Sequence, residues 1–170
     1  MYWAGYNRAM SSEINHSRRG FLRGQVRPQV APMRPPWALA EAEFLARCTR
    51  CGNCAVICPT RIIQIREGFP VIDFSAGACT FCAECVRVCV PAALRREGAA
   101  RPWQRVAVAS ESCIAHKGVE CRICGEHCDE SAIRFAPRVG GPPLPEIRAE
   151  VCTGCGACVA PCPVTAIRVR

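Results

Sequence analysis

Aromatic residues and long apolar runs are scarce in this chain of 170 residues. Only eleven residues are aromatic, which is few for the stacking platforms of a groove that binds single-stranded nucleic acid. The longest uncharged run, residues 151–167, is slightly short of a membrane-spanning helix and is interrupted by Cys, Pro and Gly. His16, His116 and His127 stand apart, with no paired nucleophile and base. We therefore expect neither a membrane span nor an enzyme.

Cysteine is the abundant residue, and all sixteen cysteines fall into four sets of four. In the last set, within residues 152–163, the thiols are separated by two, two and three residues and are followed by proline. Such an array directs three thiolates toward one bound group and points the fourth in another direction. This is the arrangement that a cubane iron–sulfur cluster requires. Gly154, Gly156 and Ala157 would let the backbone bend around a bulky cofactor.

Disulfides and zinc are the two alternatives for these cysteines. Disulfide frameworks need no uniform groups of four. Zinc ribbons use two separated Cys-x-x-Cys pairs, whereas here three regularly spaced thiols are followed by a fourth. The pattern favours iron–sulfur clusters, and zinc is the stronger of the two alternatives.

The first two sets repeat with a fixed period of 31 residues. They comprise Cys48, Cys51, Cys54 and Cys58, followed by Cys79, Cys82, Cys85 and Cys89. A fixed period indicates duplication. This is the layout of a two-cluster ferredoxin.

The third set departs from this template at Cys113, which is separated from Cys121 by seven residues instead of two. The remaining cysteines keep a common offset of 34 residues: Cys121, Cys124 and Cys128 correspond to Cys155, Cys158 and Cys162. Cys113 is expected to be a ligand on a longer connection, and the alternative is a displaced, spare thiol.

In bacterial two-cluster proteins the fourth cysteine of each array ligates the other cluster. This rule predicts that cluster 1 takes Cys48, Cys51, Cys54 and Cys89, cluster 2 takes Cys79, Cys82, Cys85 and Cys58, cluster 3 takes Cys113, Cys121, Cys124 and Cys162, and cluster 4 takes Cys152, Cys155, Cys158 and Cys128. The crossing ligands would act as cross-links, so that metal binding adds folding energy to a domain with a thin core.

Only short elements are expected between the arrays. Residues 62–65 and 70–74 indicate a small hairpin, and residues 132–135 and 146–148 are strand candidates around a Gly-Pro turn. A short helix is expected over residues 39–46. The predicted fold is α+β.

Two tandem modules, each like a bacterial two-cluster ferredoxin with short hairpins and short helices, are predicted at residues 48–104 and 105–170. An extended basic arm, residues 1–47, would precede them. The formal charge of +8 would be offset by four oxidised clusters, since each carries about −2 with its four thiolates. The arm would then stay positive beside a negative core.

The arm contains a stretch like a twin-arginine export signal, with Arg18 and Arg19 at its centre. The apolar run that should follow is interrupted by Arg23, Arg27 and Pro28. The arm is therefore interpreted either as a solvated basic tail or as a partner-binding segment that uses Arg18 and Arg19.

With these residues in view, the chain resembles the NapF ferredoxin-type proteins encoded with periplasmic nitrate reductases. The resemblance rests on the order of the arrays, the gap after Cys113, Arg-Pro-Pro-Trp at residues 34–37, Phe44-Leu45 before the first array, and Ser-Arg-Arg-Gly at residues 17–20. It implies a cytoplasmic protein with four [4Fe-4S] clusters that assists maturation or reduction of the immature nitrate reductase catalytic subunit before export. The rival implication is an electron-transfer polyferredoxin.

Overall fold

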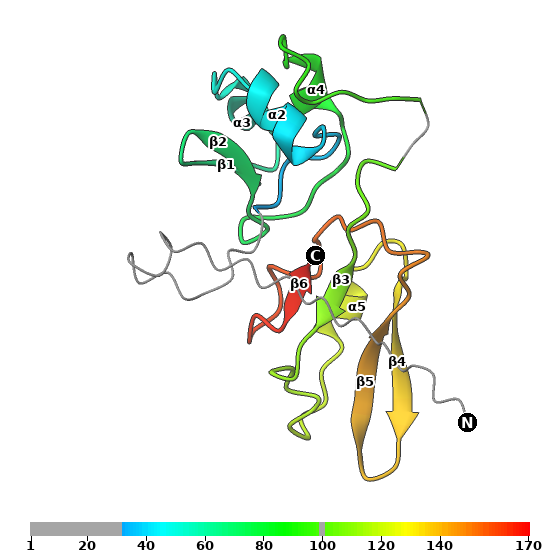
Figure 1. Cartoon of the computed structure of the whole chain (residues 1–170). Coiled ribbons are helices and arrows are strands. Elements are labelled where there is room, and N and C mark those ends of the chain that lie inside the picture. The colour runs from blue at the N-terminus through cyan, green and yellow to red at the C-terminus, as the bar shows by residue number, and fades with distance from the viewer. Residues whose placement is uncertain (1–31, 99–100) are drawn as a thin grey trace, which may run out of the picture. The chain divides into compact units, whose positions relative to one another are not determined.

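Short helices and two-stranded sheets make up the residues that the computed structural model describes, 32–98 and 101–170. The helices are α2 (Glu41–Arg47), α3 (Asn53–Val56), α4 (Glu84–Arg87) and α5 (Ile123–Glu126). The strands are β1 (Ile63–Arg66), β2 (Phe69–Ile72), β3 (Ala107–Ala109), β4 (Ile133–Arg138), β5 (Gly141–Ile147) and β6 (Ile167–Val169) (Figure 1). The expected α+β class with short hairpins is confirmed for these residues. Most of the proposed arm, including Arg18 and Arg19, lies outside them.

Both predicted hairpins are present. Strand β1 pairs with β2 in antiparallel register, with Ile63 opposite Ile72, and the turn between them uses Glu67 and Gly68 at φ 52° and 82°, the positive values that a tight hairpin turn requires. Strand β4 pairs with β5, with Ile133 opposite Ile147, and forms a longer hairpin than predicted (Figure 1).

A third strand pair was not predicted. Strands β3 and β6 are antiparallel, with Ala107 opposite Val169, and they join the segment before the third array to the segment after the fourth. In the first half of the described chain, the corresponding contact is a single bridge between Ala38 and Leu94. Strands of three residues show no alternation of apolar and polar residues, so the sequence pattern does not reveal them.

A buried pair of aliphatic residues follows the last cysteine of each array at the fourth and fifth positions. The four pairs are Ile62 and Ile63, Ala93 and Leu94, Ala132 and Ile133, and Ala166 and Ile167. The first two pairs lie in one apolar core together with Phe44 and Phe74. Because each pair stands at the same two sequence positions after its cysteine, the end of every array is attached to a buried apolar core through equivalent residues.

Helix α2 confirms the predicted short helix, with its bounds shifted to Glu41–Arg47. Phe44 is fully buried. Arg34 holds the preceding segment to this helix: its Nη2 donates to Glu41 at 2.7 Å and its Nη1 donates to the Pro70 carbonyl at 3.1 Å. The hydrogen bond from Arg34 lowers the pKa of Glu41. The guanidinium also lies 5.0 Å from the centre of the Phe44 ring.

We expect Arg34→Lys to lower the thermal midpoint, by an amount equivalent to about 1–3 kcal/mol, because one ammonium cannot make the fork of hydrogen bonds and stack on the ring. The matched control is Arg47→Lys, since Arg47 pairs with Glu43 across one helical turn while both side chains are well exposed and such pairs contribute little. Anaerobic thermal unfolding followed by circular dichroism measures both. Equal midpoints for the two variants would contradict the role given to Arg34.

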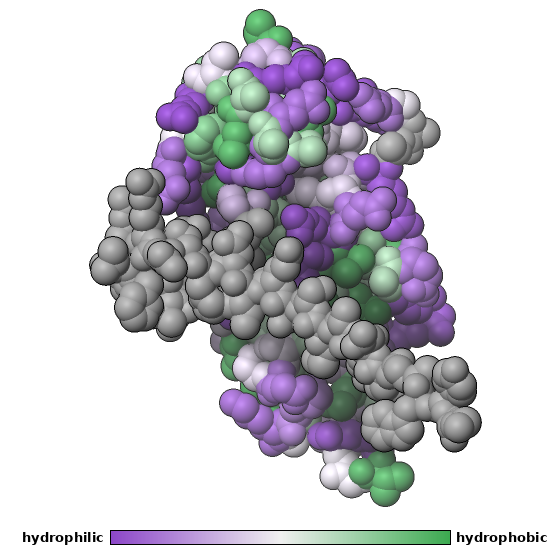
Figure 2. Space-filling view, viewed as in Figure 1, coloured by the Kyte–Doolittle hydropathy of each residue, from purple (hydrophilic) through white to green (hydrophobic). Residues whose placement is uncertain are grey.

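The surface mixes hydrophilic residues with scattered hydrophobic ones (Figure 2). Val56, Val90 and Val139 are almost completely exposed. Within residues 32–98 and 101–170, no helix combines the length and apolar character needed to cross a membrane.

Candidate iron–sulfur sites

The same turn follows the last cysteine of all four arrays. The third residue after this cysteine has positive φ, at 55° for Arg61, 52° for Ala92, 49° for Ser131 and 48° for Thr165. Its N–H donates to the carbonyl of the cysteine, over 2.9–3.2 Å in the four copies. In the third and fourth arrays the next N–H then donates to the cysteine sulfur, from Ala132 to Cys128 Sγ and from Ala166 to Cys162 Sγ, both at 3.2 Å. The turn therefore supplies donors to a negatively charged thiolate.

Three of the arrays also share a bend between their first cysteines. Arg50, Phe81 and Gly154 occupy the second position after the first cysteine, with φ of 59°, 53° and 72°. Each follows a threonine, so that Cys-Thr-x-Cys recurs three times. This repeat was a signal that the sequence interpretation did not use. The bend turns consecutive thiols toward one side of the loop, where a single group can contact them all.

Cys48, Cys51, Cys54 and Cys89 line one cavity of about 360 Å³ including its open mouth. The fourth of these residues comes from the second array. Leu94 N–H donates to Cys89 Sγ at 3.4 Å, and Phe44 and Leu94 also line the cavity. The space is thus bounded by thiols and apolar side chains.

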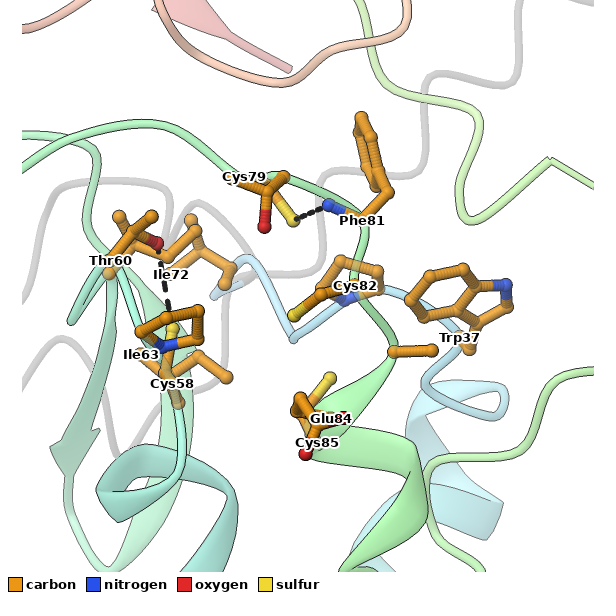
Figure 3. A pocket seen from close by; sticks show the side chains of 15 residues that line it. Trp37, Cys58, Thr60, Ile63, Ile72, Cys79, Phe81, Cys82, Glu84 and Cys85 are labelled. Carbon is orange, nitrogen blue, oxygen red and sulfur yellow. Dashed lines mark hydrogen bonds between the residues drawn. The ribbon is translucent and has the colours of Figure 1, made fainter.

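Cys58, Cys79, Cys82 and Cys85 line a second cavity, of about 350 Å³. Figure 3 shows the four sulfur atoms around a common space. Phe81 N–H donates to Cys79 Sγ at 3.4 Å, and the Thr60 hydroxyl lies 3.7 Å from Cys58 Sγ. Thr60 was not identified from the sequence.

Cys128, Cys152, Cys155 and Cys158 line a third cavity, of about 330 Å³. Ala107, at the start of β3, donates its N–H to Cys152 Sγ at 3.4 Å. The unpredicted pairing of β3 with β6 therefore also supports this set of thiols.

The set with the insertion also comes together, around Cys113. Cys113 is buried with Ala115 and Ala166, and Cys162 packs against them. Burial, followed by the charges of Cys113 and Cys121, raises the pKa of Cys124 to about 11. Arg138 holds the inserted loop by donating from Nη2 to the Ala115 carbonyl at 2.9 Å. Cys113 therefore lies beside the thiols of its own array and Cys162, in a position where it can act as a ligand.

Gathering these thiolates without a cation is unfavourable. Burial and the neighbouring thiolates raise the pKa of Cys85 and Cys158 to about 12. Cys58 differs: burial acts to raise its pKa, but hydrogen bonds from Thr60, Ile62 and Ile63 lower it overall. Positively charged iron would remove the penalty, because a coordinated thiol is deprotonated outright.

All sixteen cysteines are free thiols rather than disulfides. Within the described ranges, no three His, Cys, Asp or Glu side chains come close enough to hold one metal ion; three of the four sets of thiols instead line wider cavities. The donor type, the N–H groups directed at sulfur and the gathering of four thiols around one cavity fit a multinuclear iron–sulfur cluster.

These features define a ferredoxin-type iron–sulfur protein with [4Fe-4S] cofactors. Residues 47–93 and 117–166 match the 4Fe-4S dicluster domain family. The chain is 39% identical over 156 residues to the ferredoxin-type protein NapF of Escherichia coli strain K12, covering 91% of this chain and 94% of that protein. It is 40% identical over 168 residues to NapF of Haemophilus influenzae, covering 92% and 94%.

A more distant relative is the methylamine utilization ferredoxin-type protein MauM of Methylorubrum extorquens, which is 31% identical over 168 residues, covering 88% of this chain and 76% of MauM. The chain belongs to the NapF ferredoxin-type family, as its sequence pattern predicted.

Proposed function

We propose that the sixteen cysteines hold four [4Fe-4S] clusters in crossed sets, within modules at residues 48–104 and 105–170. The carrying observation is that Cys58 lines a cavity with Cys79, Cys82 and Cys85, although it belongs by sequence to the preceding array. In the same way, Cys128 lines a cavity with Cys152, Cys155 and Cys158. Crossed ligation joins the two arrays of each module, so that neither array can hold its cluster alone.

This composition is tested by counting iron and acid-labile sulfide in anaerobically purified protein. We expect about sixteen of each per chain, because each of four clusters contributes four of each. Stoichiometric zinc with negligible sulfide would overturn the assignment. About half the expected iron would mean that only one of the two modules holds its clusters.

The chemistry that such clusters supply is the gain and loss of single electrons. The chain's contribution is to place thiolates, N–H donors and apolar walls around each site. We therefore assign the protein to electron transfer or redox assistance, not to catalysis. A measured turnover of substrate by the purified protein alone would contradict this.

We further propose that the protein works in the cytoplasm on the immature catalytic subunit of a periplasmic nitrate reductase, assisting its maturation or reduction before export. Support comes from membership of the NapF family and from the signal-like residues 17–20. The alternative is an electron-transfer polyferredoxin between a donor and a redox enzyme. A carrier keeps its iron while cycling, whereas a cluster donor loses iron to its partner.

Arg18 and Arg19 are the proposed contacts with this partner, because the planar guanidinium pairs well with carboxylates. We expect Arg18→Gln/Arg19→Gln to weaken binding to the immature subunit, most strongly at low salt, while iron content is retained. Arg23→Gln/Arg27→Gln removes the same charge and is the matched control. Affinity and iron are measured in pull-downs at two salt concentrations; equal weakening by both double variants would leave only general attraction by the arm.

A further inference from the structure

Hydrogen bonds and aromatic packing join the loop of the fourth array to the first half of the chain. Trp103 is at the centre of this contact. The indole N–H of Trp103 donates to the Thr153 carbonyl at 2.9 Å. The Trp103 ring meets Phe81 edge to face at 5.8 Å between centres and Phe74 at 6.2 Å. Edge-to-face aromatic contacts and a partly buried indole donor with a hydrogen-bond partner are the features of a specific interface.

Gly156 completes this contact. A Cβ atom at Gly156 would overlap Cδ1 of Phe74, so the ring of Phe74 rests directly on the glycine backbone. Phe74 is itself buried, at 7% exposure. Any side chain at position 156 would therefore push the ring away.

The same contact brings together cysteines of two different sets. Cys79 N–H donates to the Cys155 carbonyl at 2.8 Å. Cys79 lines the cavity with Cys58, Cys82 and Cys85, and Cys155 lines the cavity with Cys128, Cys152 and Cys158. One main-chain hydrogen bond thus connects a proposed ligand of the second cluster to a proposed ligand of the fourth.

Within each half, the cysteines of two sets share one apolar core. In the first half, Cys85 of the second set is buried in the core against which Cys54 of the first set packs. In the second half, Cys124 of the third set and Cys158 of the fourth set are buried in the same core.

We propose that the Trp103, Phe74 and Gly156 contact, which we call the junction, makes the second and fourth clusters neighbours. The four clusters then follow the order one, two, four, three instead of the order of the chain. This inference rests on the proposed four-cluster function. It makes the first and third sites the two ends of a single route, so an electron entering at either end can reach the other half only through the junction.

Clusters held by the Cys79 set and the Cys155 set would exchange single electrons across the junction. Such an exchange would oxidise one cluster by one electron and reduce its neighbour by one, and it would require no bond change and no proton transfer. The chain's own groups, through the packing of Trp103, Phe74 and Gly156, set how closely the two sites approach each other.

The test is the magnetic interaction between reduced clusters of the full chain, measured by electron paramagnetic resonance. Cys155→Ala removes the fourth site and Cys121→Ala removes the third, each checked by iron count. We expect the interaction between the halves to be lost in Cys155→Ala and kept in Cys121→Ala. The reverse pattern, or the same result in both variants, overturns the proposed order.

Gly156→Ala tests the junction itself, and Gly52→Ala is its matched control. Both glycines follow the second cysteine of an array, with φ of 81° and 78°, but a Cβ at Gly52 has nothing within 4 Å. Ala83 occupies the same position in the second array at φ 60°, so alanine tolerates this backbone. We expect loss of the interaction in Gly156→Ala alone; an unchanged interaction at full iron content overturns the role of the junction.

If Gly156→Ala loses iron, Trp103→Phe decides, because it removes the hydrogen bond to Thr153 and keeps an aromatic ring. Trp37→Phe is its control, since the buried Trp37 Nε1 has no hydrogen-bond partner among the described residues. A weaker magnetic interaction between the halves in Trp103→Phe, but not in Trp37→Phe, supports the junction. The same change in both variants overturns it. Low iron in the unmodified chain would instead contradict the four-cluster function, so the two failures are distinguishable.

Discussion

Cys58→Ala is expected to remove the second cluster and spare the first, even though Cys58 belongs to the first array. Cys58 lines the cavity of Cys79, Cys82 and Cys85. The cavity that is lined by the other three cysteines of the first array has Cys89, and not Cys58, as its fourth thiol. Losing one of four thiolates leaves an iron without a protein ligand, so we expect iron to fall from about sixteen to about twelve per chain.

Double variants show which cluster was lost. Cys58→Ala combined with Cys82→Ala should keep about twelve iron atoms, because both changes act on one cluster and are not additive. Cys58→Ala combined with Cys51→Ala should keep about eight, because two clusters are removed. Both partner positions, Cys51 and Cys82, are exposed, which makes them a matched pair. The opposite result, with about eight atoms in the Cys82 combination, would show that ligation is not crossed.

Gly154→Ala is expected to remove the fourth cluster and destabilise the second half of the chain. A Cβ at Gly154 would overlap the Arg105 carbonyl oxygen. That backbone cannot easily retreat, because the next residue, Val106, exchanges two hydrogen bonds with Arg170, of 3.1 and 3.0 Å. We expect a loss of about 3 kcal/mol or more from overpacking, together with about four iron atoms.

The backbone angle alone does not explain this requirement for glycine. Arg50 and Phe81 hold the same array position at φ of 59° and 53°, so a side chain is tolerated there when space allows. Gly52→Ala is again the control: its φ is 78° and no atom lies within 4 Å of the added Cβ, which leaves only backbone strain of about 1–2 kcal/mol. Iron content and thermal midpoint are measured for both, and matching values would disprove the clash with Arg105.

The sequence alone predicted the features that depend on near neighbours in the chain. The spacing of cysteines decides which thiols one loop can turn toward one group, and this is set by a few consecutive peptide units. The β1 and β2 hairpin was predictable for the same reason, since Glu67 and Gly68 form its turn locally. The family was recognisable because the gap after Cys113 and the order of the arrays are both written in the chain.

Only the tertiary structure decided the features that join distant residues. The pairing of β3 with β6, the hydrogen bond from Trp103 to Thr153 and the contact between Cys79 and Cys155 link segments about 50 or more residues apart. No periodicity encodes these contacts, because each depends on how whole segments pack. The same is true of Gly154: its sequence neighbours explain a bend, but only the Arg105 carbonyl, brought against it by folding, explains why a side chain has no room.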